Sequence, residues 1–108
     1  MILSIKTKNG RMTINLIEFL YPKVSQKKVM LLVKTLMADP CANETAIRET
    51  CMFFRGDMES LMEQQAIAKM YLTSEKVGSR EYRKHMAECV RCQKRYDFFT
   101  KCLTMMGD

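Results

Sequence analysis

The chain has 108 residues, of which 47% are hydrophobic and 28% charged, and its net charge is +6. This composition excludes a disordered segment, and no apolar stretch is long enough for a signal peptide or a membrane helix. The length allows one main core. We therefore expect one cytoplasmic domain over residues 1–108 with no membrane contact, made of an N-terminal segment 1–22, a helical core 23–72 and a C-terminal helical region 73–108.

The positive charge is unevenly distributed along the chain. Residues 1–38 contain seven basic residues and one acidic residue, whereas residues 39–78 contain four basic and seven acidic residues. A basic N-terminal half is typical of a surface that meets nucleic acid or an acidic protein face, although it also occurs on ordinary solvated surfaces. The five cysteines are an odd number, and a disulfide framework is not expected in a reducing compartment.

The N-terminal segment is compatible with two structures. In the first, Asn9 and Gly10 form a two-residue turn, and the hairpin closed by this turn pairs Ile5 with Ile14. In the second, Thr13 caps a short helix instead. The residues do not decide between these alternatives.

The remaining chain after Pro22 shows helical periodicity with recognisable caps. Ser25 is expected to cap a first helix that ends before the Asp-Pro pair at 39–40, and Asn43 a second. Gly56 is expected to end the second helix, and a third is predicted over residues 57–72. After a break at 73–79, Ser79 caps a last helix that can continue through residues 96–106.

The spacing of apolar residues predicts which side chains form the core. The predicted core residues are Val29, Leu32, Val33, Leu36, Met37, Ile47, Cys51, Phe54, Leu61, Met62, Ile67, Ala68, Tyr71, Tyr82, Met86, Cys89 and Val90. Together these patterns predict a mainly α fold, a small bundle of four to five helices with an N-terminal hairpin as one alternative.

The motif "HMAECVRC" at residues 85–92 carries the clearest chemistry in the chain. On a helix, His85, Cys89 and Cys92 lie along one stripe, because positions i, i+4 and i+7 face the same side. Imidazole and thiolate are the ligands that Zn²⁺ prefers, and these three would supply most of a tetrahedral structural site. We therefore predict bound zinc.

The fourth ligand must come from another part of the chain. Cys51 is the first choice, since it lies on a preceding helix that could fold back against the last one. Cys102, Cys41 or a water molecule are the alternatives. Two other interpretations of the motif remain: buried cysteines acting as small hydrophobic residues, and a redox-active Cys-x-x-Cys pair, which is disfavoured because the helical pattern already runs through it.

The segment "YLTSEKVGSREYRKHMAECVRCQKRYDFF", residues 71–99, resembles the zinc-binding anti-sigma factor domain. The shared features are Tyr-Leu, a polar turn, a capped helix and His-x-x-x-Cys-x-x-Cys. The resemblance implies that His85, Cys89 and Cys92 are zinc ligands, joined by a residue of an upstream helix. It also implies a small helical domain that binds a sigma factor and keeps it from core RNA polymerase. The segment "DMESL" at 57–61, where the family places its upstream ligand, contains no cysteine.

These observations lead to three functional hypotheses. The first is a zinc-stabilised regulator that binds a protein of the transcription machinery, with a sigma factor as the expected partner. The alternative is a nucleic-acid-binding regulator, in which residues 43–54 would occupy the position of a recognition helix. An enzyme is not expected, since no Gly-rich phosphate loop and no Ser-His-Asp arrangement occurs.

Overall fold

The computed structural model describes residues 2–20 and 25–108. The chain divides into two compact units, which we call unit 1 (Met1–Phe53 with Cys102–Asp108) and unit 2 (Phe54–Lys101). The predicted boundary at residues 22 and 23 lies outside the described residues. The described elements, in chain order, are β1 (Ile2–Thr7), β2 (Gly10–Asn15), α1 (Leu16–Leu20), α2 (Gln26–Met37), α3 (Glu44–Ser74) and α4 (Arg80–Met105).

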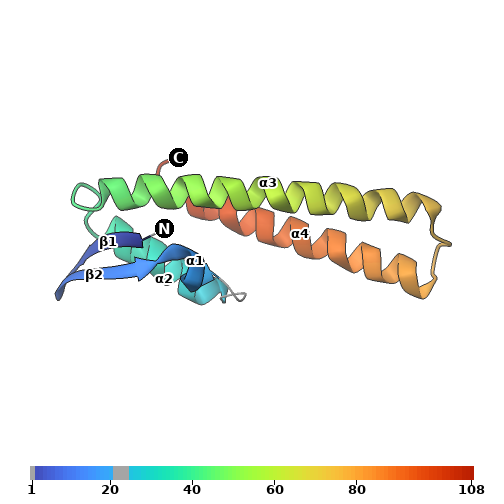
Figure 1. Ribbon diagram of the computed structural model, residues 1–108, viewed down its shortest axis with the longest axis horizontal. Coiled ribbons are helices and arrows are strands. Elements are labelled where there is room, and N and C mark those ends of the chain that lie inside the picture. Colours follow the sequence, from blue (N-terminus) through green and yellow to red (C-terminus); the bar gives the residue numbers. More distant parts are fainter. Residues whose placement is uncertain (1, 21–24) are drawn as a thin grey trace. The chain divides into compact units, whose positions relative to one another are not determined.

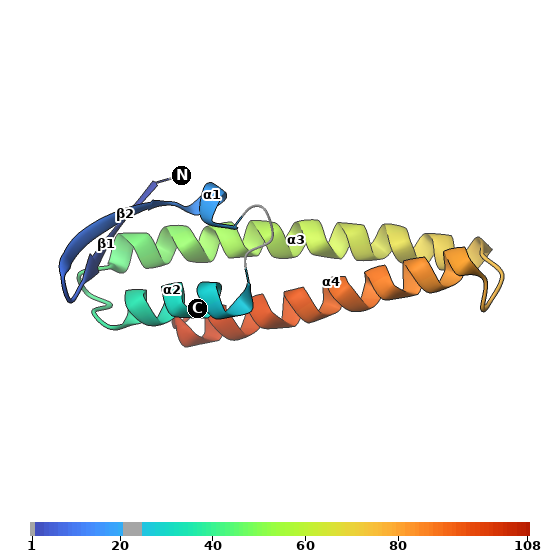
Figure 2. The ribbon, with the colours of Figure 1, turned by 90° about the horizontal axis from the view of Figure 1, so that it is seen from below.

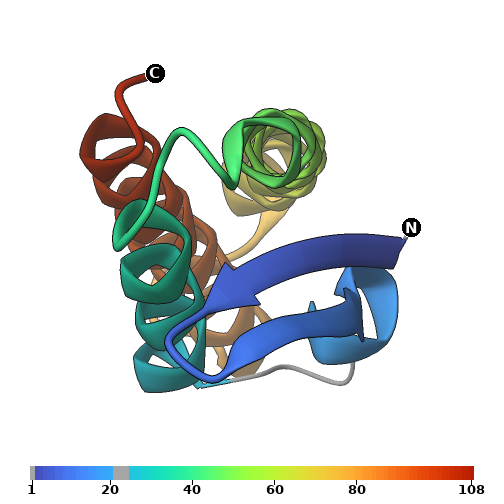
Figure 3. The ribbon, with the colours of Figure 1, turned by 90° about the vertical axis from the view of Figure 1, so that its left-hand side faces the viewer.

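The fold is mainly α, as predicted: the described residues form four helices and a single two-stranded antiparallel sheet. Both N-terminal alternatives contribute, because the hairpin is present and a short helix follows it (Figure 3). The helix begins at Leu16, three residues later than the predicted cap at Thr13. Asn15 caps it, since the Asn15 Oδ1 accepts from the backbone N–H of Ile17 at 3.1 Å and of Glu18 at 3.4 Å.

The predicted register of the hairpin is wrong by two residues. Ile5 pairs with Met12, and the turn lies at positions 8 and 9. Gly10 instead begins β2 with a φ of 114°, which other residues rarely adopt. The Thr7 hydroxyl tightens the turn by donating to the Gly10 carbonyl oxygen and accepting from the Asn9 N–H. Because the shift is an even number of residues, Ile5 keeps its face of the sheet and is buried.

Asn43 fastens the outer edge of β1 to the connection between α2 and α3. Its Oδ1 accepts from the Lys6 N–H at 2.8 Å, and its Nδ2 donates to the carbonyl oxygens of Lys6 at 3.3 Å and Leu36 at 3.2 Å. The side chain is 1% exposed. Asn43 does occupy the predicted N-cap position, since α3 begins at Glu44 and the Asn43 carbonyl oxygen accepts from the Ile47 N–H at 2.8 Å, but its side-chain amide binds elsewhere. It occupies the edge of β1 as a neighbouring strand would.

Helix α2 has the predicted boundaries and core. The Ser25 hydroxyl accepts from the Lys28 N–H at 3.4 Å, and the helix ends at Met37, two residues before the Asp-Pro pair. Its buried side chains are Val29, Leu32, Val33 and Leu36, and within unit 1 the hairpin contributes buried Leu3 and Ile5. The predicted core of this helix is confirmed, except that Met37 is only partly buried.

Helix α3 continues through Gly56, so the two predicted helices at 44–55 and 57–72 are a single one of 31 residues. Gly56 does not adopt a positive φ, and a Cβ added there would meet nothing within 4 Å. A glycine inside a helix costs only about 1 kcal/mol relative to alanine. In unit 2 the helix buries Phe54 before the glycine and Leu61 after it, and this burial outweighs that cost.

In unit 2, α3 and α4 lie side by side in opposite directions and are joined by a short turn (Figures 1 and 2). The Ser79 hydroxyl caps α4 by accepting from the Tyr82 N–H at 3.1 Å, as predicted. Phe54 and Phe99 are fully buried, and their ring centroids are 4.8 Å apart. This aromatic pair anchors one end of the helical hairpin.

The buried side of each helix in unit 2 follows a spacing of three and four residues. On α3 the buried side chains include Leu61, Gln65 and Ala68, and on α4 they include Cys89, Cys92 and Phe99. This is the spacing of a seam between two antiparallel helices. Five of the predicted core residues lie outside it and are exposed, so those predictions are wrong: Met62, Ile67, Tyr71, Met86 and Val90.

Candidate functional site

The three residues of the motif lie on the side of α4 that meets α3. The His85 ring is stacked on the Tyr71 ring, with centroids 4.8 Å apart and an angle of 13° between the planes. Its Nε2 lies 3.7 Å from the Glu75 Oε1. Tyr71 is near the end of α3 and Glu75 follows that helix. His85 thus sits near the turn of the helical hairpin, three-quarters covered by these neighbours.

A small cavity opens beside this histidine within unit 2. Its volume is about 280 Å³. It is lined by Gln64, Ile67, Ala68, Tyr71, Lys84, His85 and Glu88.

Cys89 and Cys92 are buried in the seam between α3 and α4. The Cys89 sulfur lies 3.9 Å from the Gln65 carbonyl oxygen, and the Cys92 sulfur lies 4.0 Å from the Gln64 Oε1. Neither Cys89 nor Cys92 is part of a disulfide bond. The structure therefore brings the stripe predicted from the sequence to the inner side of α4, where the two thiols are buried as small side chains.

Within residues 2–20 and 25–108, the structure does not assemble a metal centre. There, no three His, Cys, Asp or Glu side chains are grouped so that they could hold a metal ion. Cys51, the predicted fourth ligand, is buried in unit 1, as is Cys102, and Cys41 is exposed there. The zinc site and its four ligands stay a prediction.

Gln65 is a buried polar residue of the seam that sequence reasoning missed. It is 6% exposed, and its Nε2 donates to the Cys89 carbonyl oxygen at 3.1 Å and to the Gln93 Oε1 at 3.2 Å. A buried amide that finds partners on the opposite helix favours one alignment of two helices over others. Its position four residues after Leu61 and three before Ala68 is the signal that would have found it.

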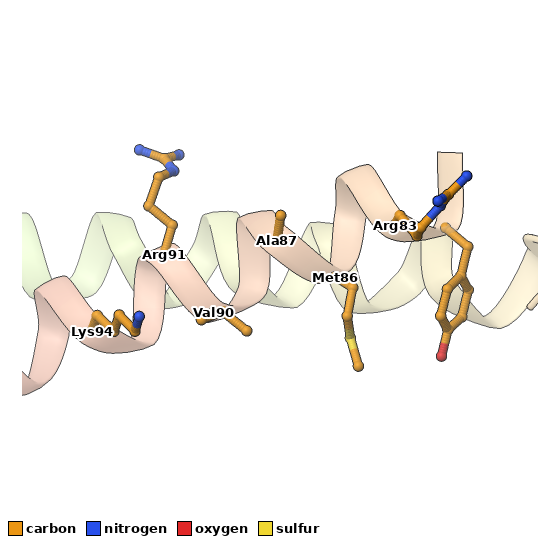
Figure 4. Close-up of a pocket in the computed structure, with 7 residues that line it drawn as sticks. Arg83, Met86, Ala87, Val90, Arg91 and Lys94 are labelled. Carbon is orange, nitrogen blue, oxygen red and sulfur yellow. The ribbon is translucent and has the colours of Figure 1, made fainter. Parts of the chain in front are cut away.

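The opposite side of α4 carries a shallow groove, which we call the outer face. Its volume is about 560 Å³, and it is lined by Tyr82, Arg83, Met86, Ala87, Val90, Arg91 and Lys94. Figure 4 shows Met86 and Val90 on the same side of the helix, one turn apart. Met86 is 45% exposed and Val90 48%. The sequence pattern predicts both as core residues, and the structure exposes them.

The charged side chains of the outer face are all basic. Arg91 pairs with Glu88 one turn before it, and this hydrogen bond raises the pKa of the Arg91 guanidinium above its usual range. Arg83 and Lys94 have no ion pair within the part of the chain that the structure describes. The outer face thus combines exposed apolar side chains with uncompensated positive charge.

The predicted recognition helix of the nucleic-acid hypothesis forms the first turns of α3. Arg48, its basic residue, pairs with Glu44 at 3.2 Å. This contact places a carboxylate beside the guanidinium that phosphates would require. Nucleic-acid binding stays a prediction.

Comparison of the chain with protein families, with curated proteins and with solved structures gives no match. Among the described residues, no helix combines the length and the apolar character needed to cross a bilayer.

Proposed function

We propose that the chain is a non-enzymatic regulator that binds another protein, a component of the transcription machinery, and that this partner is a sigma factor. The observation that carries the proposal is the exposure of large apolar side chains on both helices of unit 2. These side chains are Met62, Ile67, Met70, Tyr71, Met86 and Val90.

Large apolar side chains that lie together on a helix are unfavourable in water, so their exposure calls for an explanation. Scattered single ones are ordinary, but contiguous apolar surface on a helix is typical of a binding face. Methionine is well suited to such a face, because its flexible thioether adapts to the contour of a partner. Met70 is 70% exposed and Ile67 55%, on the same few turns of α3. The sigma factor as partner is supported by the resemblance of residues 71–99 to the anti-sigma domain.

The proposal includes zinc as a structural ion held by His85, Cys89, Cys92 and Cys51. Its support is the alignment of the first three along one side of α4. Metal analysis of protein purified without chelator should give one zinc per chain, and less in a Cys92→Ser variant. Zinc-free wild-type protein that unfolds cooperatively would refute this part of the proposal without touching protein binding.

The function is tested by mixing the purified full chain with individual purified sigma factors. We expect a 1:1 complex in light scattering after size exclusion, and loss of sigma binding to core RNA polymerase when the chain is in excess. A Met70→Ser variant, with Met105→Ser as the control on α4 in unit 1, should weaken the complex. If none of the sigma factors forms a complex at tens of micromolar, a concentration that detects even weak interfaces, the sigma assignment fails.

A further inference from the structure

The outer face of α4 has the layout of a helix-binding groove. Tyr82, Met86 and Val90 follow one another at intervals of four residues, and Ala87 lies beside them with no bulk to block approach. Four-residue steps keep these side chains on one side of the helix, since each turn contains 3.6 residues. A ridge of apolar side chains with a shallow groove beside it is what a second helix packs against.

Charge decides what kind of helix fits. Arg83, Arg91 and Lys94 flank the apolar row, and none of the residues that line the groove is acidic. Among the residues that the structure describes, Glu88 pairs with Arg91, and no carboxylate pairs with Arg83 or Lys94. A partner with carboxylates beside its apolar residues would pair with Arg83 and Lys94, whereas a basic partner would be repelled.

From these observations we infer that the outer face of α4 is the docking surface for an acidic amphipathic helix of the protein partner, an inference that rests on the proposed function. From residue 82 to residue 94 the helix rises about 18 Å, so the bound segment is about 12 residues long. Its apolar residues are spaced by three and four, and Asp or Glu flank them, in a helix-in-groove contact.

Two other occupants fit the surface less well. A phosphate backbone would use the cations but would leave Met86 and Val90 facing charged groups, and their burial would then contribute nothing. A second copy of the chain, docked through the same face, would set Arg83 and Lys94 against their own counterparts, and like charges at an interface are unfavourable.

The test uses the full chain and a synthetic amphipathic peptide of about 18 residues, long enough to cover the groove with a turn to spare at each end. The peptide carries leucines at helical spacing with glutamates beside them, and binding is measured by calorimetry. A second peptide has lysines in place of the glutamates. Double-stranded DNA and vesicles containing anionic lipid are measured under the same conditions.

The variants separate the outer face from general charge. Arg83→Glu combined with Lys94→Glu reverses the exposed cations of the groove. Lys69→Glu combined with Lys76→Glu makes the same change in net charge at exposed sites outside the groove. Circular dichroism confirms that each variant is folded. We expect the acidic peptide to bind wild type, the groove variant to lose at least tenfold in affinity, and the control variant to stay within twofold.

Further outcomes bear directly on the inference. The inference is overturned if both peptides bind equally, if the control variant loses as much affinity as the groove variant, or if the acidic peptide does not bind wild type. If the acidic peptide does not bind, but DNA, vesicles or a second copy of the chain bind wild type and not the groove variant, the surface belongs to that occupant instead. A sigma factor that binds the groove variant as tightly as wild type overturns the docking surface but leaves the proposed function standing. If the acidic peptide binds but no sigma factor forms a complex, the docking surface stands and the proposed sigma partner fails.

Discussion

Replacement of Asn43 by alanine should be among the most destabilising single changes in unit 1. The side chain is 1% exposed and makes three hydrogen bonds, one accepted from the Lys6 N–H and two donated to the carbonyl oxygens of Lys6 and Leu36. A hydrogen bond contributes about 1 kcal/mol net, and more when its loss leaves a buried partner unsatisfied. The expected loss in the free energy of unfolding is therefore about 2–4 kcal/mol.

Urea unfolding followed by circular dichroism measures this loss, with Asn9→Ala as the control. Asn9 is exposed, and its backbone N–H donates to the Thr7 hydroxyl, a bond that alanine keeps, so the control should change stability by less than about 0.5 kcal/mol. An Asn43→Asp variant should not restore the wild-type stability, because a carboxylate cannot donate to the two carbonyl oxygens. Hydrogen exchange adds a local readout, since the Lys6 amide should lose protection. A loss below about 1 kcal/mol with unchanged exchange at Lys6 would refute the role assigned to this amide.

Three further predictions concern other parts of the chain. Phe99→Ala should cost about 3–5 kcal/mol in chemical denaturation because it removes a fully buried ring, and Phe98→Ala, at a partly exposed site, should cost clearly less; equal costs would contradict the assigned packing. Gly56→Ala should stabilise the chain by about 0.5–1 kcal/mol in the same assay, and a destabilised variant would mean that this position is not helical. The hydrogen bond from Lys6 holds the pKa of the Asp39 carboxyl below its ordinary value of 3.8, so in acid the unfolded chain binds more protons than the folded one. The contribution of this carboxyl to folding stability is therefore present above pH 3.8 and is lost as the pH falls below it. An NMR titration should show this lowered pKa, and Lys6→Ala should return it toward 3.8.

Local patterns in the sequence determined most of the helical structure. The caps at Ser25 and Ser79 and the Asp-Pro pair after α2 act within a few residues, and the structure has helix ends at these places. The alignment of His85, Cys89 and Cys92 along one side of α4 follows from helical spacing alone. Whether these residues hold zinc stays a prediction, because ligand spacing on one helix does not supply a fourth ligand from elsewhere.

Tertiary contacts decided what local patterns left open. In unit 1, the amide of Asn43, 37 residues away from Lys6, binds the outer edge of β1. In unit 2, the burial of Phe54 and Leu61 carries α3 through Gly56.

The candidate binding surface was the hardest feature to predict. Helix α4 has two apolar rows at helical spacing, one through Cys89 and one through Met86 and Val90, and periodicity cannot tell which row meets the neighbouring helix. The row through Cys89 and Phe99 packs against α3, because residues of α3 supply its partners: Gln65 donates to the Cys89 carbonyl oxygen, and the Phe54 ring packs on the Phe99 ring. The other row is left in solvent, where only the folded structure shows it to be a surface.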